Sequence, residues 1–354
     1  MTRSLAALVV GLLVSLLAPG AARAEGAVTV EGGGGVNKSG ASLPTSGFAY
    51  DRLALRLELS PTVSLGGGVR LTRDFAAGAV GGSRLSTGSD WVWLMSSDVS
   101  WSVSDHVTLG ASGITSPPST RDVASSVVLG PRSAVGVVNA TSTSFGGAVE
   151  AAYDSFDEAT PHVVDVLVDA GLGVGRYLTR QSLTNLDPIG AGCVANLTCT
   201  SPTAPGIDDG VTQLRGEASA VTTFAERFEL GLGGAVYAYS GADPTTAGTV
   251  SATIRDATGK PLGVGRYGAG IPLLPPRWSL RPEIGARWDR VSVRGYYQYA
   301  KYVFDGEAGH TVGTRIQVKE GALRLFVTGT YRADTASDGS SRSLFGGLGI
   351  SVRW

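Results

Sequence analysis

The sequence has only one long hydrophobic run, at residues 5–17, and almost no net charge. A helix needs about 20 apolar residues to span a bilayer, so nothing after this run predicts a transmembrane helix. The formal net charge of −1 comes without a polybasic tail or an acidic run. A nucleic-acid partner is therefore not expected.

Cysteine, histidine and methionine are also scarce. The chain has two cysteines, three histidines and two methionines. No histidine lies near Cys193 or Cys199, so the cysteine pair does not predict a metal site. In an exported protein the pair predicts a disulfide that closes a short ring in the loop 179–210.

No cofactor is expected either. Residues 263–268 match G-x-G-x-x-G, but a dinucleotide site needs a preceding strand and a following helix. Here the motif lies between Pro261 and Pro272, in a predicted loop.

The start of the chain predicts export. Arg3 precedes the apolar run, and Ala22-Arg23-Ala24 forms a small-residue cleavage site. We expect residues 1–24 to be a cleaved signal peptide and residues 25–354 to form a single domain. A membrane anchor is the alternative, but the run is short for one. The exported chain is then soluble or crosses a membrane as strands.

Composition favours strands. The 51 glycines are about twice the ordinary usage of ~7%, and glycine destabilises a helix by up to about 1 kcal/mol per residue. Apolar and small or polar residues alternate with period two, which is the pattern of two-faced strands. We expect about 14 such strands, within about two of that number. Their predicted ranges are 27–36, 48–59, 62–73, 89–103, 107–115, 144–153, 162–178, 211–224, 227–239, 277–288, 290–303, 313–319, 322–332 and 342–354.

Short and long connections alternate between these segments. The short ones are 60–61, 104–106, 225–226, 289 and 319–321, and 154–161 is moderately longer. The long ones are 37–47, 74–88, 116–143, 179–210, 240–276, 304–312 and 333–341. Periplasmic turns are short and extracellular loops are long in outer-membrane barrels, so this alternation favours a barrel over a soluble sandwich, the alternative for such strands.

Aromatic residues mark the ends of one predicted face. In segment 89–103 a face with tryptophans near both ends lies opposite a face that contains Asp98. Indole prefers the headgroup level of a membrane. We predict aromatic girdles formed by Trp91, Trp93, Trp101, Trp288, Tyr331 and Trp354.

The last strand carries the family resemblance. Residues 342–354 read RSLFGGLGISVRW, with Leu344, Leu348, Ile350, Val352 and Trp354 on one face. A terminal strand that ends on an aromatic residue resembles the closing strand of bacterial outer-membrane β-barrels. The resemblance implies an all-β, antiparallel up-and-down transmembrane barrel in the outer membrane of a Gram-negative bacterium. Its implied partners are outer-membrane lipid and the barrel-assembly machinery. The resemblance is general and reaches no named transport family.

The opposite faces carry the charges. An arginine or lysine facing lipid at the membrane midplane costs about 2–4 kcal/mol, so these charges are expected inside. They are either ion pairs that stiffen the wall or part of a solute pathway, and both roles are compatible. Arginines crowd the second half and acids the first two thirds, which predicts a transverse field. The predicted lumenal residues are Arg52, Arg56, Arg70, Asp98, Asp165, Asp169, Arg215, Glu217, Arg281, Glu283, Arg287, Arg290, Arg294, Arg315, Arg324 and Arg353, with Glu58 and Glu229.

These features predict a passive, porin-like channel for small polar solutes, with a bias toward anions. The loops 116–143, 179–210 and 240–276 would form its lid or constriction. The first alternative is a closed barrel that displays its loops for recognition or adhesion. The second is a hydrolase at the rim, which could use only His310, beside Asp305 and Glu307. No catalytic residue is expected, and the sequence does not set the solute or the oligomeric state.

Overall fold

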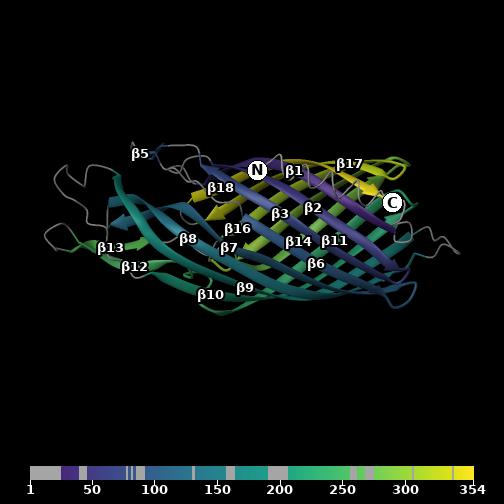
Figure 1. Cartoon of the computed structure of the whole chain (residues 1–354), viewed down its shortest axis with the longest axis horizontal. Helices are drawn as coiled ribbons and strands as arrows, with labels where there is room; N and C mark the ends of the chain where they lie inside the picture. Colours follow the sequence, from purple (N-terminus) through teal and green to yellow (C-terminus); the bar gives the residue numbers. More distant parts are fainter. Residues whose placement is uncertain are drawn as a thin grey trace.

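The computed structural model shows a closed barrel of 14 antiparallel strands (Figure 1). It describes residues 25–39, 46–76, 79–80, 83–84, 92–129, 132–156, 164–189, 206–255, 261–267, 275–304, 307–336 and 339–354. Within these ranges no helix is long and apolar enough to cross a membrane. The predicted signal peptide 1–24, the disulfide between Cys193 and Cys199, and Trp91 all lie outside the described residues.

Each strand of the barrel pairs with its neighbours in chain order. The first seven strands are β1 (Glu25–Ser39), β2 (Ser46–Ser60), β3 (Val63–Ala76), β6 (Val92–Ser102), β7 (Val107–Leu129), β8 (Arg132–Asp154) and β9 (Val164–Ile189). The other seven are β10 (Ile207–Phe224), β11 (Phe228–Gly241), β14 (Pro276–Arg287), β15 (Val291–Tyr302), β16 (Ala308–Glu320), β17 (Leu323–Ala336) and β18 (Gly339–Arg353). Two small hairpins, β4 (Ala79–Val80) with β5 (Ser83–Arg84) and β12 (Val250–Arg255) with β13 (Pro261–Tyr267), lie outside the ring.

The first and last strands close the ring. β1 pairs with β18 along its length, from Ala27↔Arg353 to Ser39↔Ser341. Each of the predicted strand ranges overlaps one strand of the ring, so the predicted fold class and strand number are confirmed. The period-two alternation located the strands because each wall position faces either lipid or the lumen.

The short turns lie at one end of the barrel, which is the periplasmic end of such a fold. Between β10 and β11 the chain reverses through Ala225 and Glu226, both at positive φ (48° and 59°). Two consecutive residues in that region match a type I′ hairpin turn, whose twist suits the flanking strands. Between β2 and β3, the Ser60 hydroxyl accepts hydrogen bonds from the N–H groups of Thr62 and Val63, at 3.3 and 3.0 Å. These turns set the strand register at the inner mouth.

The other end differs from the sequence prediction. β7, β8 and β9 extend well beyond their predicted ranges, so most of the predicted loop 116–143 is strand, as is the start of 179–210. The β7–β8 register shifts between Ser116 and Ser119, where Pro117 and Pro118 cannot donate to the ladder. The strand resumes after this bulge. Figure 1 shows these strands, with β12 and β13, projecting beyond one end of the barrel.

The predicted loop 240–276 also contains structure. The β12–β13 hairpin lies against β7, although three strands separate β7 from β11 in the ring. This connection therefore crosses part of the extracellular mouth. Nearer β11, Ala247 is buried against Val211 and Tyr239.

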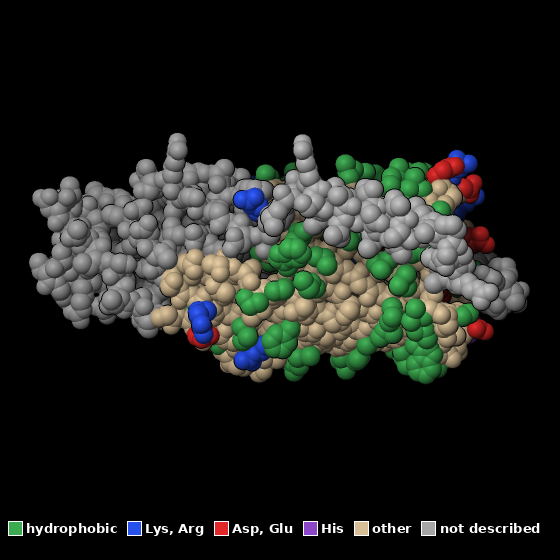
Figure 2. Space-filling view, in the orientation of Figure 1, with side chains coloured by type: hydrophobic (Ala, Val, Ile, Leu, Met, Phe, Trp, Pro, Cys, Tyr) green, Lys and Arg blue, Asp and Glu red, His purple; other side chains and the backbone are tan. Residues whose placement is uncertain are grey.

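The outward face of the wall is apolar. Leucine, valine, isoleucine and aromatic side chains are exposed along it, including the predicted outward residues Leu344, Leu348 and Ile350 of β18. In Figure 2 hydrophobic side chains are spread over the described wall between its two ends, and the charged side chains in view lie toward those ends. An exposed apolar belt around a closed barrel is the surface that lipid covers.

Aromatic residues lie on this outward face toward both ends. Trp93, Trp101, Trp288 and Tyr331 are exposed there. Trp354 exchanges backbone hydrogen bonds with Gly26 at 3.1 Å, which anchors the last residue at the seam. The sequence prediction did not include other exposed outward aromatics, namely Phe145, Tyr153, Phe224, Phe228, Trp278 and Tyr297.

Candidate functional site: the barrel lumen

The pairing register divides every strand into two faces, because directly paired residues share a face. Side chains of the face opposite the apolar belt reach one another over intervening strands. Arg56 on β2, for example, donates from Nη2 to the hydroxyls of Ser64 on β3 and Ser100 on β6, at 2.9 and 3.3 Å. Such convergence occurs on the concave side of a curved sheet, so this is the lumenal face.

The predicted lumenal charges fall on this face with one exception. Arg290 lies in the turn between β14 and β15, where it pairs with Glu320 at 2.9 Å and is mostly exposed. It is part of the periplasmic rim rather than of a strand. The register places the others on the lumenal face, namely Arg52, Arg56, Glu58, Arg70, Asp98, Asp165, Asp169, Arg215, Glu217, Glu229, Arg281, Glu283, Arg287, Arg294, Arg315, Arg324 and Arg353.

Opposite signs of charge lie on opposite sides of the ring. In strand order, β15–β18 lie across the ring from β6–β9. The described lumenal side chains of β6–β9 include the acids Asp98, Glu150, Asp165 and Asp169 and no arginine or lysine. Those of β15–β18 include Arg294, Arg315, Arg324 and Arg353. The lumen therefore carries a transverse field, directed from the arginine wall to the acidic wall.

Ion pairs also run along and between neighbouring strands. Arg215 pairs with Glu217, and Arg281 with Glu283, each at 2.8 Å. These side chains are partly exposed, so each pair contributes little to stability. With Asp169 they line a polar cavity of about 390 Å³ inside the barrel. Both roles foreseen for the charges are geometrically compatible, since the paired groups still face the cavity.

Glu229 on β11 is the most buried of the lumenal carboxylates in ion pairs, with 8% of its side chain exposed. It accepts hydrogen bonds from Arg287 Nη2 and Arg294 Nε, both at 2.7 Å. Two charge-assisted hydrogen bonds on one buried carboxylate fix both arginines in place.

Aromatic rings lie flat against the lumenal wall, over glycines. Phe326 on β17 covers its direct partner Gly349 on β18, and Tyr296 on β15 covers its partner Gly313 on β16. Since a Cβ at either glycine would overlap the ring, glycine is what permits this packing. Tyr50 on β2 lies in the same way over Gly33 on β1.

Each of these rings also carries an arginine. The guanidinium carbon is 4.2 Å from the ring centroid for Arg315 over Phe326 and for Arg281 over Tyr296, and 4.6 Å for Arg70 over Tyr50. The arginine lies on the neighbouring strand away from the glycine. Among the described residues, the lumen therefore contains three glycine–aromatic–arginine stacks, in which cation–π contact holds each guanidinium against its ring.

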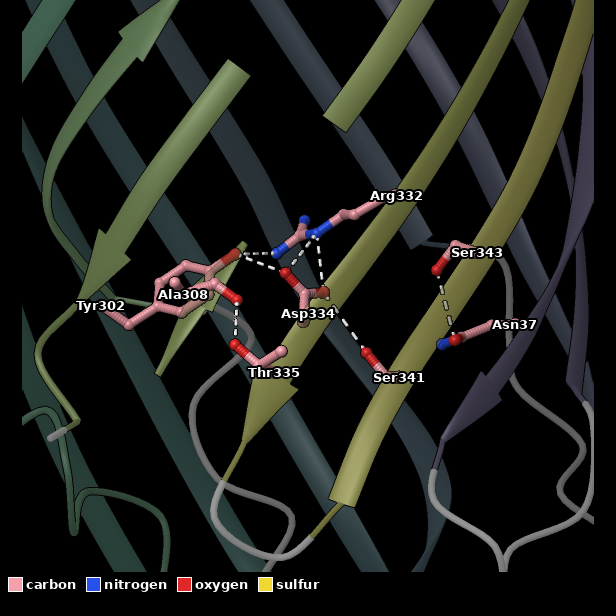
Figure 3. A network of polar contacts seen from close by, with 8 residues as sticks. All are labelled: Asn37, Tyr302, Ala308, Arg332, Asp334, Thr335, Ser341 and Ser343. Atoms are coloured by element: carbon pink, nitrogen blue, oxygen red, sulfur yellow. Dashed lines mark hydrogen bonds and ion pairs between the residues drawn. The ribbon is translucent and has the colours of Figure 1, made fainter. Parts of the chain in front are cut away.

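A polar network ties the strands at the extracellular rim (Figure 3). Arg332 donates from Nε to both carboxylate oxygens of Asp334, at 3.0 and 2.8 Å, and from Nη2 to the Tyr302 hydroxyl at 2.7 Å. Tyr302 donates to Asp334 at 2.6 Å, and Ser341 does so at 3.3 Å. The contacts join β15, β17 and β18 over β16. This rim is held by side chains as well as by the ladder.

The segment after β11 folds toward the lumenal side of the mouth. The Gly248 N–H donates to Asp209 Oδ2 at 2.8 Å, and Asp209 shares the lumenal face with Val211. The Asp243 carboxylate accepts from the N–H of Thr245 at 2.8 Å and from its hydroxyl at 2.7 Å. These bonds, the backbone one first, lower the pKa of Asp243 below its ordinary value. Residues 242–249 thus form a compact turn over one side of the mouth.

The structure places His310 in a strand rather than in the predicted loop, and Asp305 lies outside the described residues. His310 lies in β16 on the outward face, paired with Tyr299. Its Nδ1 is 2.7 Å from the Tyr297 hydroxyl. In this position the imidazole belongs to the outer aromatic belt and does not face the lumen. Among the described residues, no group of histidine, cysteine, aspartate and glutamate side chains could hold a metal ion.

Several lumenal residues escaped the sequence prediction. Glu31 and Glu150 lie on the lumenal faces of β1 and β8, and the same alternation of faces would have predicted both. Tyr50 and Phe326 were harder to find, because the alternation assigns apolar side chains to the outward face and these two rings lie on the lumenal face. Their signal is the glycine at the paired position, which is visible only once the register is known.

The fold resembles those of known outer-membrane channels. The toluene transporter TbuX of Ralstonia pickettii superposes with a TM-score of 0.52 at 11% identity, over 94% of this chain and 89% of that chain. The monoaromatic hydrocarbon channel CymD superposes with a TM-score of 0.50 at 11% identity, over 93% and 89%. No family model matches the sequence, and no curated protein matches it significantly.

At such low identity the likeness shows the fold alone. Together with the outward apolar belt, it confirms the predicted class of protein and its location. The chain is an integral β-barrel of the Gram-negative outer membrane.

Proposed function

We propose that this barrel is a passive channel that admits small polar solutes and favours anions. The observation that carries the proposal is the separation of charge in the lumen, with Arg294, Arg315, Arg324 and Arg353 across the ring from the acids of β6–β9. Fixed opposite charges orient dipolar solutes, and the guanidinium groups gathered on β15–β18 attract anions to that side of the pathway. No enzymatic role is part of the proposal.

The lumen supports polar rather than apolar cargo. Three of the aromatic rings that face it, those of Tyr50, Tyr296 and Phe326, are stacked beneath guanidinium groups, so arginine covers much of their apolar surface. The cavity beside Arg215, Glu217 and Asp169 is likewise lined by charged side chains. A solute that donates and accepts hydrogen bonds replaces its hydration there, whereas a hydrocarbon does not.

Reversal potential in planar bilayers under a KCl gradient tests the proposal. We expect discrete open-channel steps and a reversal potential on the chloride side. A clear cation preference of the purified protein would contradict the anion bias. Complete absence of steps at every voltage would instead support the closed barrel that displays its loops, for which the extended β7–β9 wall is the favouring feature.

The second candidate function is transport of a small hydrophobic molecule. It is favoured by the likeness to TbuX and CymD, whose names record toluene and monoaromatic hydrocarbons as their cargo. Saturation-transfer NMR with toluene separates the two functions. Saturable toluene binding that survives 0.5 M salt would favour the second, because screening weakens only the electrostatic pathway.

A further inference from the structure

Cationic side chains converge at the periplasmic mouth. A cavity of about 560 Å³ is lined there by Arg287, Arg290, Arg294, Arg315, Lys319 and Arg324. Asp289 is the single acid in its lining. Glu229 neutralises part of this charge from behind, through Arg287 and Arg294, and Glu320 pairs with Arg290. Six cationic side chains therefore line the cavity, against three carboxylates in or beside its lining, which leaves a net charge of +3.

Two of these arginines, Arg315 and Arg324, have hydrogen-bond donors available for a ligand. Arg315 is stacked on Phe326, with 4.2 Å between the guanidinium carbon and the ring centroid, so its plane is fixed while its N–H edge stays available. Arg324 Nε is buried and has no hydrogen-bond partner among the described residues. A buried donor without a partner destabilises the protein, and an acceptor in the cavity would remove that cost.

We propose that this cavity, the inner-mouth pocket, is a binding site for a small oxyanion with several acceptor oxygens, of the phosphate or polycarboxylate class. The fork of donors on a guanidinium fits two oxygens of one such ligand at once. Arg315 and Arg324 would contact the ligand directly. Lys319 would add charge, and Glu229 would position Arg294. The pocket would concentrate the anion at the periplasmic end of the pathway.

This inference rests on the proposed function in one respect, since it makes the anion bias the property of a defined site. Binding itself does not require conduction. The two proposals can therefore fail separately, because the channel can prefer anions without a saturable site, and the site can bind in a barrel that conducts nothing.

Equilibrium dialysis of the detergent-solubilised full barrel against labelled inorganic phosphate tests the site, with citrate as a competitor. We expect one saturable site per chain, displaced by citrate and weakened by salt. The double substitution Arg315→Gln with Arg324→Gln should weaken phosphate binding by about tenfold or more, since each guanidinium supplies charge-assisted hydrogen bonds. Arg180→Gln is the matched control. Arg180 pairs with Asp208 at the other end of the barrel, at 2.9 Å, and its loss should leave binding unchanged.

Three results would overturn the inference. They are absence of saturable phosphate binding to the unaltered protein, equal binding by the double variant, and an equal loss in the Arg180→Gln control. Heat-modifiable gel mobility verifies that each variant is folded. If the double variant does not fold, Arg324→Lys is used instead. It keeps the charge but loses the planar fork and the Nε donor, so unchanged binding by that variant also counts against the site.

Discussion

Arg294 on β15 donates a hydrogen bond from Nε to Glu229 Oε2 on β11, at 2.7 Å, across the intervening strand β14. Arg287 reaches the other oxygen of the same carboxylate at the same distance. One buried acid thus orders two arginines of the inner mouth and offsets part of their repulsion. Glu229 therefore affects both the stability of the barrel and the charge that lines its inner mouth.

Glu229→Gln should therefore destabilise the barrel. The amide keeps the shape but leaves two guanidinium groups without a buried counter-charge, and we expect a loss of about 2–3 kcal/mol in the free energy of unfolding. Urea unfolding measured by gel mobility gives this value. Glu320→Gln is the control, because its pair with Arg290 is exposed and contributes less than about 1 kcal/mol. Equal losses in the two variants would contradict the role of burial.

Gly349→Ala should disrupt the packing of side chains on the lumenal face of the wall. The added Cβ would overlap the Phe326 ring, so the ring must move. Arg315 then loses its stacking contact with that ring. We expect a loss of about 1–3 kcal/mol in unfolding free energy and an altered single-channel conductance. Gly329→Ala serves as the comparison, since the nearest atom to its added Cβ is 3.8 Å away. A conductance change in Gly329→Ala but not in Gly349→Ala would reverse the assignment.

Adjacent residues of β10 test which face meets lipid. Ala218 belongs to the outward face, and Ser219 donates to Asp169 Oδ2 in the lumen at 3.1 Å. Ala218→Arg should cost about 2–4 kcal/mol near the membrane midplane and reduce the folded fraction in the outer membrane. Ser219→Arg places the same side chain beside Asp169 and Glu217, so folding should be retained. Heat-modifiable mobility of membrane fractions reports both, and the opposite outcome would mean that the faces are exchanged.

The turn at residues 242–249 should loosen in acid. The pKa of the Asp243 carboxyl is lowered by the N–H and hydroxyl of Thr245. A group whose pKa is lowered by folding adds stability above its ordinary pKa of about 4 and loses it as the pH falls through the lowered value. Hydrogen exchange of the turn amides, corrected for intrinsic rates, should show protection at neutral pH that falls below about pH 4. In Asp243→Asn the protection should not vary with pH over that range.

The strand positions were predictable because a membrane wall imposes two environments on alternate residues. Leu53, Leu55 and Leu57 against Arg52 and Arg56 leave one choice of face, since the other would put arginine in lipid. The lengths of β7 and β8 were not predictable in this way. Beyond the membrane both faces of a strand meet water, the alternation disappears, and Pro117-Pro118 imitates a strand end.

The charge separation in the lumen was predictable as a tendency, and the inner-mouth pocket was not. The alternation of faces places Arg315 and Arg324 each in the lumen, but it does not show that they lie close together. Their approach to Phe326 and Arg294 depends on how far each strand is displaced against the next. That displacement is set by turns such as Ala225-Glu226, whose positive φ angles no alternation reveals.

The seam between β1 and β18 bears on how the protein is made. Gly33 pairs with Gly347 there, so at this pair the two strands that are farthest apart in the chain meet through backbone alone. Contacts between such distant segments are entropically costly and form late. Tyr50 reaches from β2 across Gly33 to Gly347 and donates to Glu31 at 2.7 Å. The Tyr50 hydroxyl can contact Gly347 only once the last strand has arrived, so the surroundings of Tyr50 distinguish a finished barrel from an open intermediate during insertion.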